Sequence, residues 1–193
     1  MDPFLSVLAG IGLSAACGFR IFVPMLVMSI AVKAGHLEMV SAFQWVGSDT
    51  ALIAFAVATC LEIAAYYIPW FDHLMDTIAT PTAIVAGTIV TASMVGGMSP
   101  FLKWTLAVIA GGGAAGLVQG ATVVTRAASG ATTGGLGNPI VATLELVGSI
   151  FMSVLAVLVP VAAVVLFILG VIFLWRKVGT RLLRRASAPS RQI

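Results

Sequence analysis

Long, mostly apolar runs without charged residues alternate with short polar segments along the chain. The longest uncharged runs cover residues 77–102, 104–125, 127–144 and 146–175. Each is close to or above the about 20 apolar residues that an α-helix needs to cross roughly 30 Å of hydrocarbon. The pattern therefore predicts an all-α protein that passes through a membrane several times.

Six membrane spans account for this pattern. The run from Pro139 to Trp175 is too long for one ordinary span, and Pro160 is the natural place to divide it because proline interrupts a helix. The predicted spans are residues 4–32, 50–68, 80–97, 104–126, 139–157 and 160–176. A basic tail follows at residues 177–193.

Composition and charge exclude a soluble enzyme domain and a nucleic-acid-binding protein. Hydrophobic residues make up 60% of the 193 positions and charged residues only 9%, far below the roughly 25% charge of soluble domains. Six of the ten Lys and Arg residues follow Trp175. Under the positive-inside rule this tail is cytoplasmic, so six spans predict an inner-membrane protein with both termini in the cytoplasm.

The two halves of the chain resemble each other weakly. The segment Ala58–Pro69 aligns with Val141–Met152, which superposes Glu62 on Glu145. Upstream, Gly10, Ser14 and Arg20 precede Gly116, Gly120 and Arg126 by the same 106 positions. Three spans in each half would make residues 1–98 and 99–176 two repeats of opposite orientation, an arrangement typical of secondary transporters.

Three charged residues inside the predicted spans are the strongest candidates for function. An arginine near the middle of a bilayer is costly unless it faces protein, water or an anion. Gly18 and Pro24 flank Arg20 and weaken its helix, which favours a broken or re-entrant helix. Arg20 is either a structural partner of Glu62 or Glu145, or a substrate-binding or gating residue. The two glutamates could instead load and release a proton.

Asp72, His73 and Asp76 form a second candidate site between two predicted spans. Asp72 and Asp76 share a helix face, and a stripe through Glu62 and Tyr66 leads to His73 and Asp76 at helical spacing. Carboxylates and imidazole at this spacing could hold a divalent metal or relay protons. The alternative is an ordinary solvated turn, and no other cofactor is indicated.

Small residues form two ridges suited to close helix packing, within the fold or in a homodimer. They are Gly10, Ser14 and Gly18 in the first half, and Gly112, Gly116 and Gly120 in the second. The segment Ala128–Pro139 is too polar and glycine-rich for a helix. It predicts a loop or re-entrant segment, with Asn138 as the cap of the next helix.

Several motifs together resemble a known family. "GFRxFxP" near the N-terminus, "LExxA…P…DHxxD" in the middle and "NPxxxxxE" later are similar to the bacterial membrane proteins of the DUF4126 family, over roughly residues 5 to 175. The chain has Tyr66 and Tyr67 at two charged positions of the family pattern, Thr80 where the pattern has an arginine and Leu146 where it has an acidic residue. The resemblance implies a six-span architecture and no established activity.

Taken together, these features favour a small transporter or channel for a charged solute. Its path would be lined by Arg20, Glu62, Arg126, Asn138 and Glu145. An intramembrane metal-dependent enzyme acting on a lipid or isoprenoid, and a membrane scaffold, are the alternatives. No catalytic residues are assigned, because the sequence has no recognisable triad, phosphate loop or thiol pair. The expected partners are the lipid bilayer, a small solute or ion and a second copy of the chain, with no nucleic acid.

Overall fold

The chain folds into helices joined by short connections. The structure, a computed structural model, describes the backbone of residues 2–186 and the side chains of residues 2–68 and 77–177. Its helices, in chain order, are α1 (Pro3–Cys17), α2 (Phe22–Lys33), the 3₁₀-helix η1 (Ser41–Gly47), α3 (Asp49–Tyr66), α4 (Pro69–Met94), α5 (Pro100–Leu106), the π-helix η2 (Ala107–Gly112), α6 (Gly113–Thr133), α7 (Asn138–Leu158) and α8 (Pro160–Ala186). No strand occurs in the described backbone, so the predicted all-α class is confirmed.

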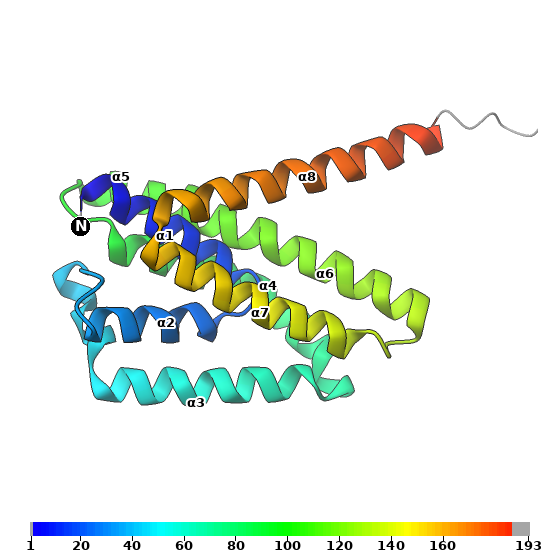
Figure 1. Cartoon of the computed structure of the whole chain (residues 1–193), viewed down its shortest axis with the longest axis horizontal. Helices are drawn as coiled ribbons and strands as arrows, with labels where there is room; N and C mark the ends of the chain where they lie inside the picture. Colours follow the sequence, from blue (N-terminus) through cyan, green and yellow to red (C-terminus); the bar gives the residue numbers. More distant parts are fainter. Residues whose placement is uncertain (1, 187–193) are drawn as a thin grey trace, which may run out of the picture.

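Within the described residues, five helical stretches are long and apolar enough to cross a membrane. They are Asp49–Tyr66, Thr77–Met94, Pro100–Thr133, Asn138–Leu158 and Pro160–Lys177. Their directions alternate along the chain and their axes run roughly along the long direction of the molecule (Figure 1). Most residues of these stretches are apolar and not buried inside the protein, as expected where lipid and not water surrounds the helices.

The predicted first span, residues 4–32, is instead a hairpin of two short helices. α1 runs into the bundle and α2 runs back toward the end where α1 began (Figure 1). Pro3 and Ser6 at the start of α1 line one cavity together with Glu38–Val40, which follow α2. The hairpin is therefore re-entrant: it enters the bundle and leaves from the same end.

The tip of the hairpin lies between Gly18 and Ile21. Gly18 terminates α1, and its amide donates to the carbonyl oxygen of Ala15 at 3.1 Å. Pro24 falls in the first turn of α2, where its missing N–H costs nothing. The break thus falls within the stretch that Gly18 and Pro24 bound in the sequence.

The hairpin changes the predicted topology. Five long stretches put the start of α1 and the end of α8 at opposite ends of the bundle (Figure 1), so the prediction that both termini are cytoplasmic is not confirmed. Residues 1–98 supply two of the long stretches and residues 99–176 supply three, so the six-span inverted repeat is not confirmed. Hydropathy could not reveal this, because a hairpin and a span are equally apolar.

Small residues let α1 lie close to α4 and α6. The hydroxyl of Ser14 donates to the carbonyl oxygen of Gly87 at 2.6 Å. A Cβ at Gly10 would lie 3.1 Å from the Cα of Thr91, and one at Gly18 only 2.5 Å from the carbonyl oxygen of Ala115. Backbones at such distances leave no room for larger side chains.

The second predicted ridge packs along only part of its length. A Cβ at Gly112 would lie 2.6 Å from the hydroxyl of Thr88, and one at Gly116 would lie 3.2 Å from Ile84. Gly120 has no neighbour within 4 Å and does not contribute. The π-helix η2 lies where this ridge meets α4.

The connection between α6 and α7 is shorter than predicted. The segment Ala128–Pro139 is predicted to be non-helical, but α6 continues to Thr133. Its polar hydroxyl groups do not prevent a helix because they are satisfied within it, as where Thr133 donates to the carbonyl oxygen of Ser129 at 2.7 Å. Gly134 and Gly135 then end the helix with φ of 62° and 91°. Asn138 is not the cap of α7: it is the first helical residue, and Gly137 precedes it without a side-chain cap.

Replacing Gly87 tests whether close backbone packing sets the stability of the bundle. A Cβ there would lie 2.7 Å from the Cβ of Ala115 and 2.9 Å from the carbonyl oxygen of Gly111. We expect Gly87→Ala to lower the unfolding free energy by about 1–3 kcal/mol, because a packed interior does not accommodate an added methyl group. Thermal unfolding in detergent measures the change, and Gly120→Ala is the matched control with open space around it. Equal stability of the two variants would contradict the packing assignment.

Candidate functional site

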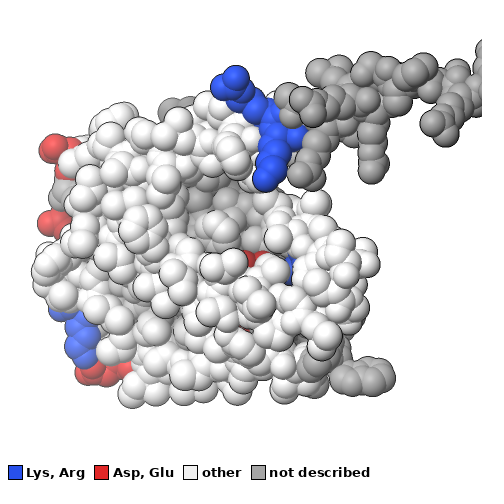
Figure 2. Space-filling view, turned by 45° about the vertical axis from the view of Figure 1, so that its right-hand side comes forward, with Lys and Arg blue, Asp and Glu red and all other residues white. Residues whose placement is uncertain are grey.

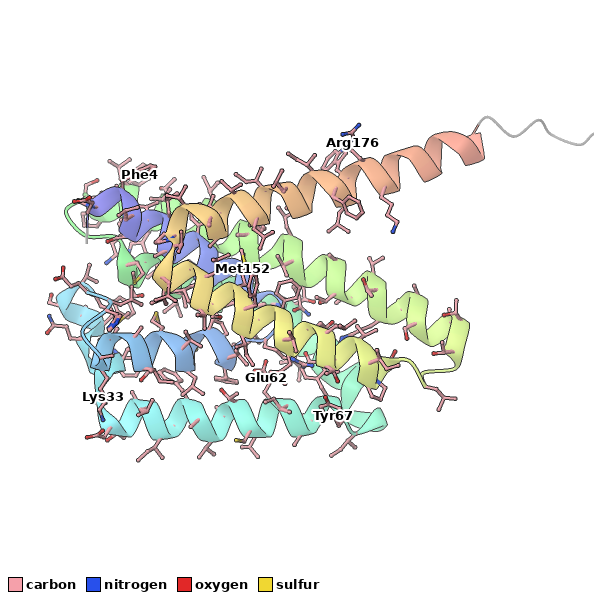
Figure 3. All side chains as sticks on the ribbon, in the orientation of Figure 1. Phe4, Lys33, Glu62, Tyr67, Met152 and Arg176 are labelled. Carbon is pink, nitrogen blue, oxygen red and sulfur yellow. The ribbon has the colours of Figure 1, made fainter. Side chains whose placement is uncertain are left out.

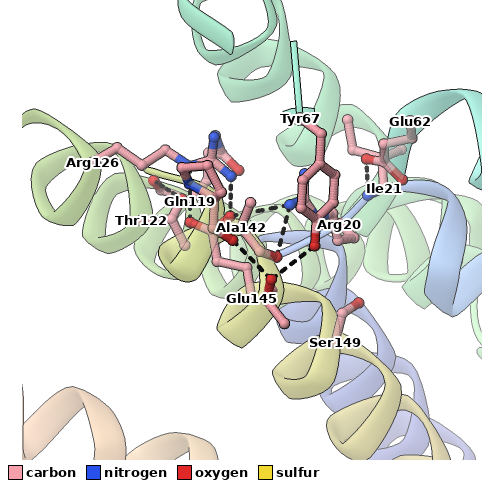
Figure 4. A network of polar contacts seen from close by, with 12 residues as sticks. Arg20, Ile21, Glu62, Tyr67, Gln119, Thr122, Arg126, Ala142, Glu145 and Ser149 are labelled. Carbon is pink, nitrogen blue, oxygen red and sulfur yellow. Dashed lines mark hydrogen bonds and ion pairs between the residues drawn. The ribbon is translucent and has the colours of Figure 1, made fainter. Parts of the chain in front are cut away.

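Arg20 lies at the tip of the re-entrant hairpin and is almost completely buried. Its side chain is 1% exposed. The Nη2 group donates to the carbonyl oxygen of Ala142 at 2.9 Å and lies 3.6 Å from Oε2 of Glu145. Both partners belong to the first turns of α7, so the hairpin tip and α7 are joined through one guanidinium group (Figure 4).

Arg126 reaches the same glutamate from α6. Its Nε donates to Oε1 of Glu145 at 3.0 Å, and its Nη2 donates to Oε2 of the same carboxylate. Such bidentate pairing, with two hydrogen bonds between one guanidinium and one carboxylate, is among the strongest interactions of an arginine. Arg126 and Glu145 are both buried, so Glu145 is the shared counter-charge of two arginines from distant parts of the sequence.

The ring of Tyr66, near the end of α3, contacts both arginines. The guanidinium carbons of Arg20 and Arg126 lie 3.7 Å and 4.1 Å from the ring centroid. A guanidinium over an aromatic face gains a cation–π attraction that grows when water is absent. Tyr66 therefore stabilises two positive charges at the site without adding a negative one.

Glu62 has a role that the sequence did not reveal. It was predicted as an ion-pair partner of Arg20 or as a proton carrier, but its oxygens accept the backbone N–H groups of Ile21 at 2.7 Å and Phe22 at 3.0 Å. These amides begin α2, where the helix dipole favours a negative charge. Glu62 points from α3 toward α2 (Figure 3). Its two hydrogen bonds therefore attach the hairpin tip to α3.

A cavity of about 680 Å³ adjoins this charged cluster. It lies between the end of α6, the start of α7 and Thr77 of α4, and both Arg126 and Asn138 line it. Its remaining lining residues are small: Val123, Ala127, Gly130, Ala131, Gly134 and Gly135. Figure 2 shows acidic and basic atoms recessed in a hollow whose surroundings are uncharged, apart from charged side chains at the edges of the view.

The second predicted cluster lies outside the described side chains. Asp72, His73 and Asp76 fall in the first turns of α4, shortly before Thr77, which lines the cavity. Among the side chains that are described, no group of three His, Cys, Asp or Glu residues could hold a metal ion. Metal binding or proton relay by these three residues stays a prediction.

Sequence reasoning selected most of the charged residues but missed the neutral groups that hold them. Arg20, Arg126 and Glu145 come together, whereas Glu62 serves the backbone. Tyr66 appeared only as one member of a polar stripe along a helix. The carbonyl of Ala142, which accepts from Arg20, carries no signal in a sequence.

Comparison with known proteins gives a family and no function. The family described as "Domain of unknown function (DUF4126)" matches residues 7–179. Neither the curated proteins nor the solved structures yield a match.

Neutralising Glu145 tests the shared counter-charge. We expect Glu145→Gln to lower the unfolding free energy by about 3–5 kcal/mol, because it leaves two buried guanidinium groups without their carboxylate. Asp49→Asn is the control: Asp49 pairs with Lys33 but is 79% exposed, and exposed pairs contribute about 1 kcal/mol or less. Thermal unfolding in detergent compares the two, and similar losses would argue against the assignment.

A second substitution tests the pinning of the hairpin. Glu62→Gln keeps one acceptor oxygen but places an amide NH₂ opposite a backbone N–H. We therefore expect the unfolding free energy to fall by about 1–3 kcal/mol. Hydrogen exchange should accelerate at the amides of Ile21 and Phe22 and not in α7. Glu38→Gln, at an exposed position, serves as the control. Unchanged exchange at the tip would refute the role of Glu62.

Proposed function

The chain belongs to the DUF4126 family. We propose that this protein moves a small anion across the bilayer, because its helices enclose a cluster of buried charged residues. The observation that carries the proposal is the position of Arg126. Arg126 lines a cavity of about 680 Å³, and a second arginine, Arg20, is buried against the same tyrosine ring. A buried arginine at a water-accessible cavity within a membrane favours anion binding.

The hydrogen bonding of Arg20 supports this proposal. Within the described part of the chain, neither Nε nor Nη1 of Arg20 has a hydrogen-bond partner. Buried donors are satisfied in nearly all proteins, and an unsatisfied one is costly. An anion that advances from the cavity past Arg126 would supply the missing acceptor. Arg20 and Arg126 would then act as successive binding positions.

The re-entrant hairpin supports a gated path. A second cavity of about 270 Å³ lies at the other end of the bundle, lined by Ser6, Glu38 and Gly97 among others. The hairpin extends from that end toward the charged cluster (Figure 1), and in this proposal its tip is the barrier between the two cavities. Movement of a solute from one cavity to the other requires the tip to shift, and Glu62 holds the tip in its present place.

The distribution of basic residues supports an orientation in the inner membrane. Arg176 and Lys177 of α8 lie toward the same end as the cavity of Arg126, whereas Lys33 and Lys103 lie at the opposite end. Under the positive-inside rule the cavity and the C-terminus face the cytoplasm. The N-terminus, at the opposite end of the bundle, then faces outward.

Transport is tested with purified protein in liposomes. We expect influx of small anions, assayed with chloride, inorganic phosphate and acetate in turn. Arg126→Gln should reduce the influx about tenfold or more, since a hydrogen bond to a charged group contributes about 1.5–3 kcal/mol. Arg126→Lys should retain part of it because the charge remains.

Lys103→Gln is the matched control, because it removes a positive charge at the far end of the bundle. Each variant is first shown to be folded by its thermal unfolding. Influx unaffected by Arg126→Gln in folded protein, or influx of cations alone, would overturn the proposal.

A further inference from the structure

A third depression, an apolar groove separate from the charged cluster, lies mainly between α6, α7 and α8. It has a volume of about 300 Å³ and is lined by apolar side chains and glycines. Leu117, Phe151, Leu166, Phe167 and Leu174 contribute most of its larger apolar side chains. The proposed transport path does not use it, because no charged residue lines it.

Two glycines keep the groove open. A Cβ on Gly148 would have only the ring of Phe19 nearby, at 3.9 Å, and a Cβ on Gly170 would have no neighbour within 4 Å. Neither glycine is needed for close packing of helices, unlike Gly87 or Gly18. Because they lack side chains, Gly148 and Gly170 leave the groove open along α7 and α8.

The groove ends at a basic, interfacial rim on α8. Leu174 is its last lining residue on that helix, and the next three residues are Trp175, Arg176 and Lys177. Trp175 is 77% exposed, and tryptophan concentrates at the level of lipid headgroups. The Nζ of Lys177 lies 5.7 Å from the ring centroid of Phe173. Figure 3 shows Arg176 on the side of α8 that faces away from the bundle.

We propose that this groove binds one acyl chain of an anionic phospholipid, with its phosphate group held by Lys177 and with Arg176 adding positive charge at the same level of α8. The apolar lining matches an acyl chain, and the basic rim at the interface matches a negatively charged headgroup. A second copy of the chain fits less well, because it would bring its own Arg176 and Lys177 against the same rim. The assignment does not depend on the proposed transport function.

The test uses the full-length protein purified in mild detergent, with equal amounts of phosphatidylglycerol and phosphatidylcholine added. Native mass spectrometry counts the lipids that remain bound. We expect phosphatidylglycerol to be retained in preference to phosphatidylcholine. The double variant Arg176→Gln with Lys177→Gln should lower this preference about tenfold or more, since each basic residue near an anionic surface adds roughly fivefold.

Gly170→Leu tests the groove itself. A Cβ at Gly170 has no neighbour within 4 Å, so we expect the added side chain to enter the groove, the protein to fold and most of the bound lipid of both kinds to be lost. Gly113→Leu is the matched control, because Gly113 also has open space around it but does not line the groove. Lys103→Gln is the control for removal of charge.

Two outcomes would overturn the proposal. One is unchanged retention of phosphatidylglycerol in both the double variant and Gly170→Leu. The other is a dimer that Gly170→Leu dissociates into monomers, which would assign the groove to a second copy of the chain.

Discussion

The burial of two arginines against one glutamate is the constraint on which the structure depends. A guanidinium group inside a membrane protein is tolerated only where carboxylates, carbonyls or aromatic faces replace water. Arg20 and Arg126 obtain these from Glu145, the carbonyl of Ala142 and the ring of Tyr66. The groups come from the hairpin tip, α3, α6 and α7. None of these elements can shift alone without leaving a buried charge uncompensated.

The re-entrant hairpin brings this cluster deep into the bundle, and small residues make the hairpin possible. α1 contacts α4, α6, α7 and α8, so it is the most enclosed element of the described fold. It fits there because Gly10, Ser14 and Gly18 allow backbones to approach closely. Packing of small side chains therefore sets the depth of Arg20, and the depth of Arg20 decides which carboxylate it meets. Stability and the candidate site are products of the same contacts.

Predictions from single residues succeeded where one residue type had few physical options. A charged side chain in an apolar run must find a partner, which is why Arg20, Arg126 and Glu145 were recognisable as a group of interest. The break in the first helix was also recognisable, since Gly18 and Pro24 both weaken a helix. The backbone partners of Glu62 were not predictable, because a carboxylate satisfies a backbone amide as well as an arginine. The length of α6 was misread because threonine hydroxyls can bond within their own helix, as they do at Thr132 and Thr133.

By itself, the sequence determined that this is an all-helical membrane protein of the DUF4126 family, and it identified the ionisable residues that such a membrane protein must shelter. Hydropathy and charge are properties of composition, so they are readable without coordinates. Only the tertiary structure decided that the first apolar run turns back instead of crossing, that the ends of the bundle carry opposite termini and that one glutamate serves two arginines. Each of these is a choice between arrangements that bury similar apolar area. Contacts between residues far apart in the chain select among them, and no local pattern encodes such contacts.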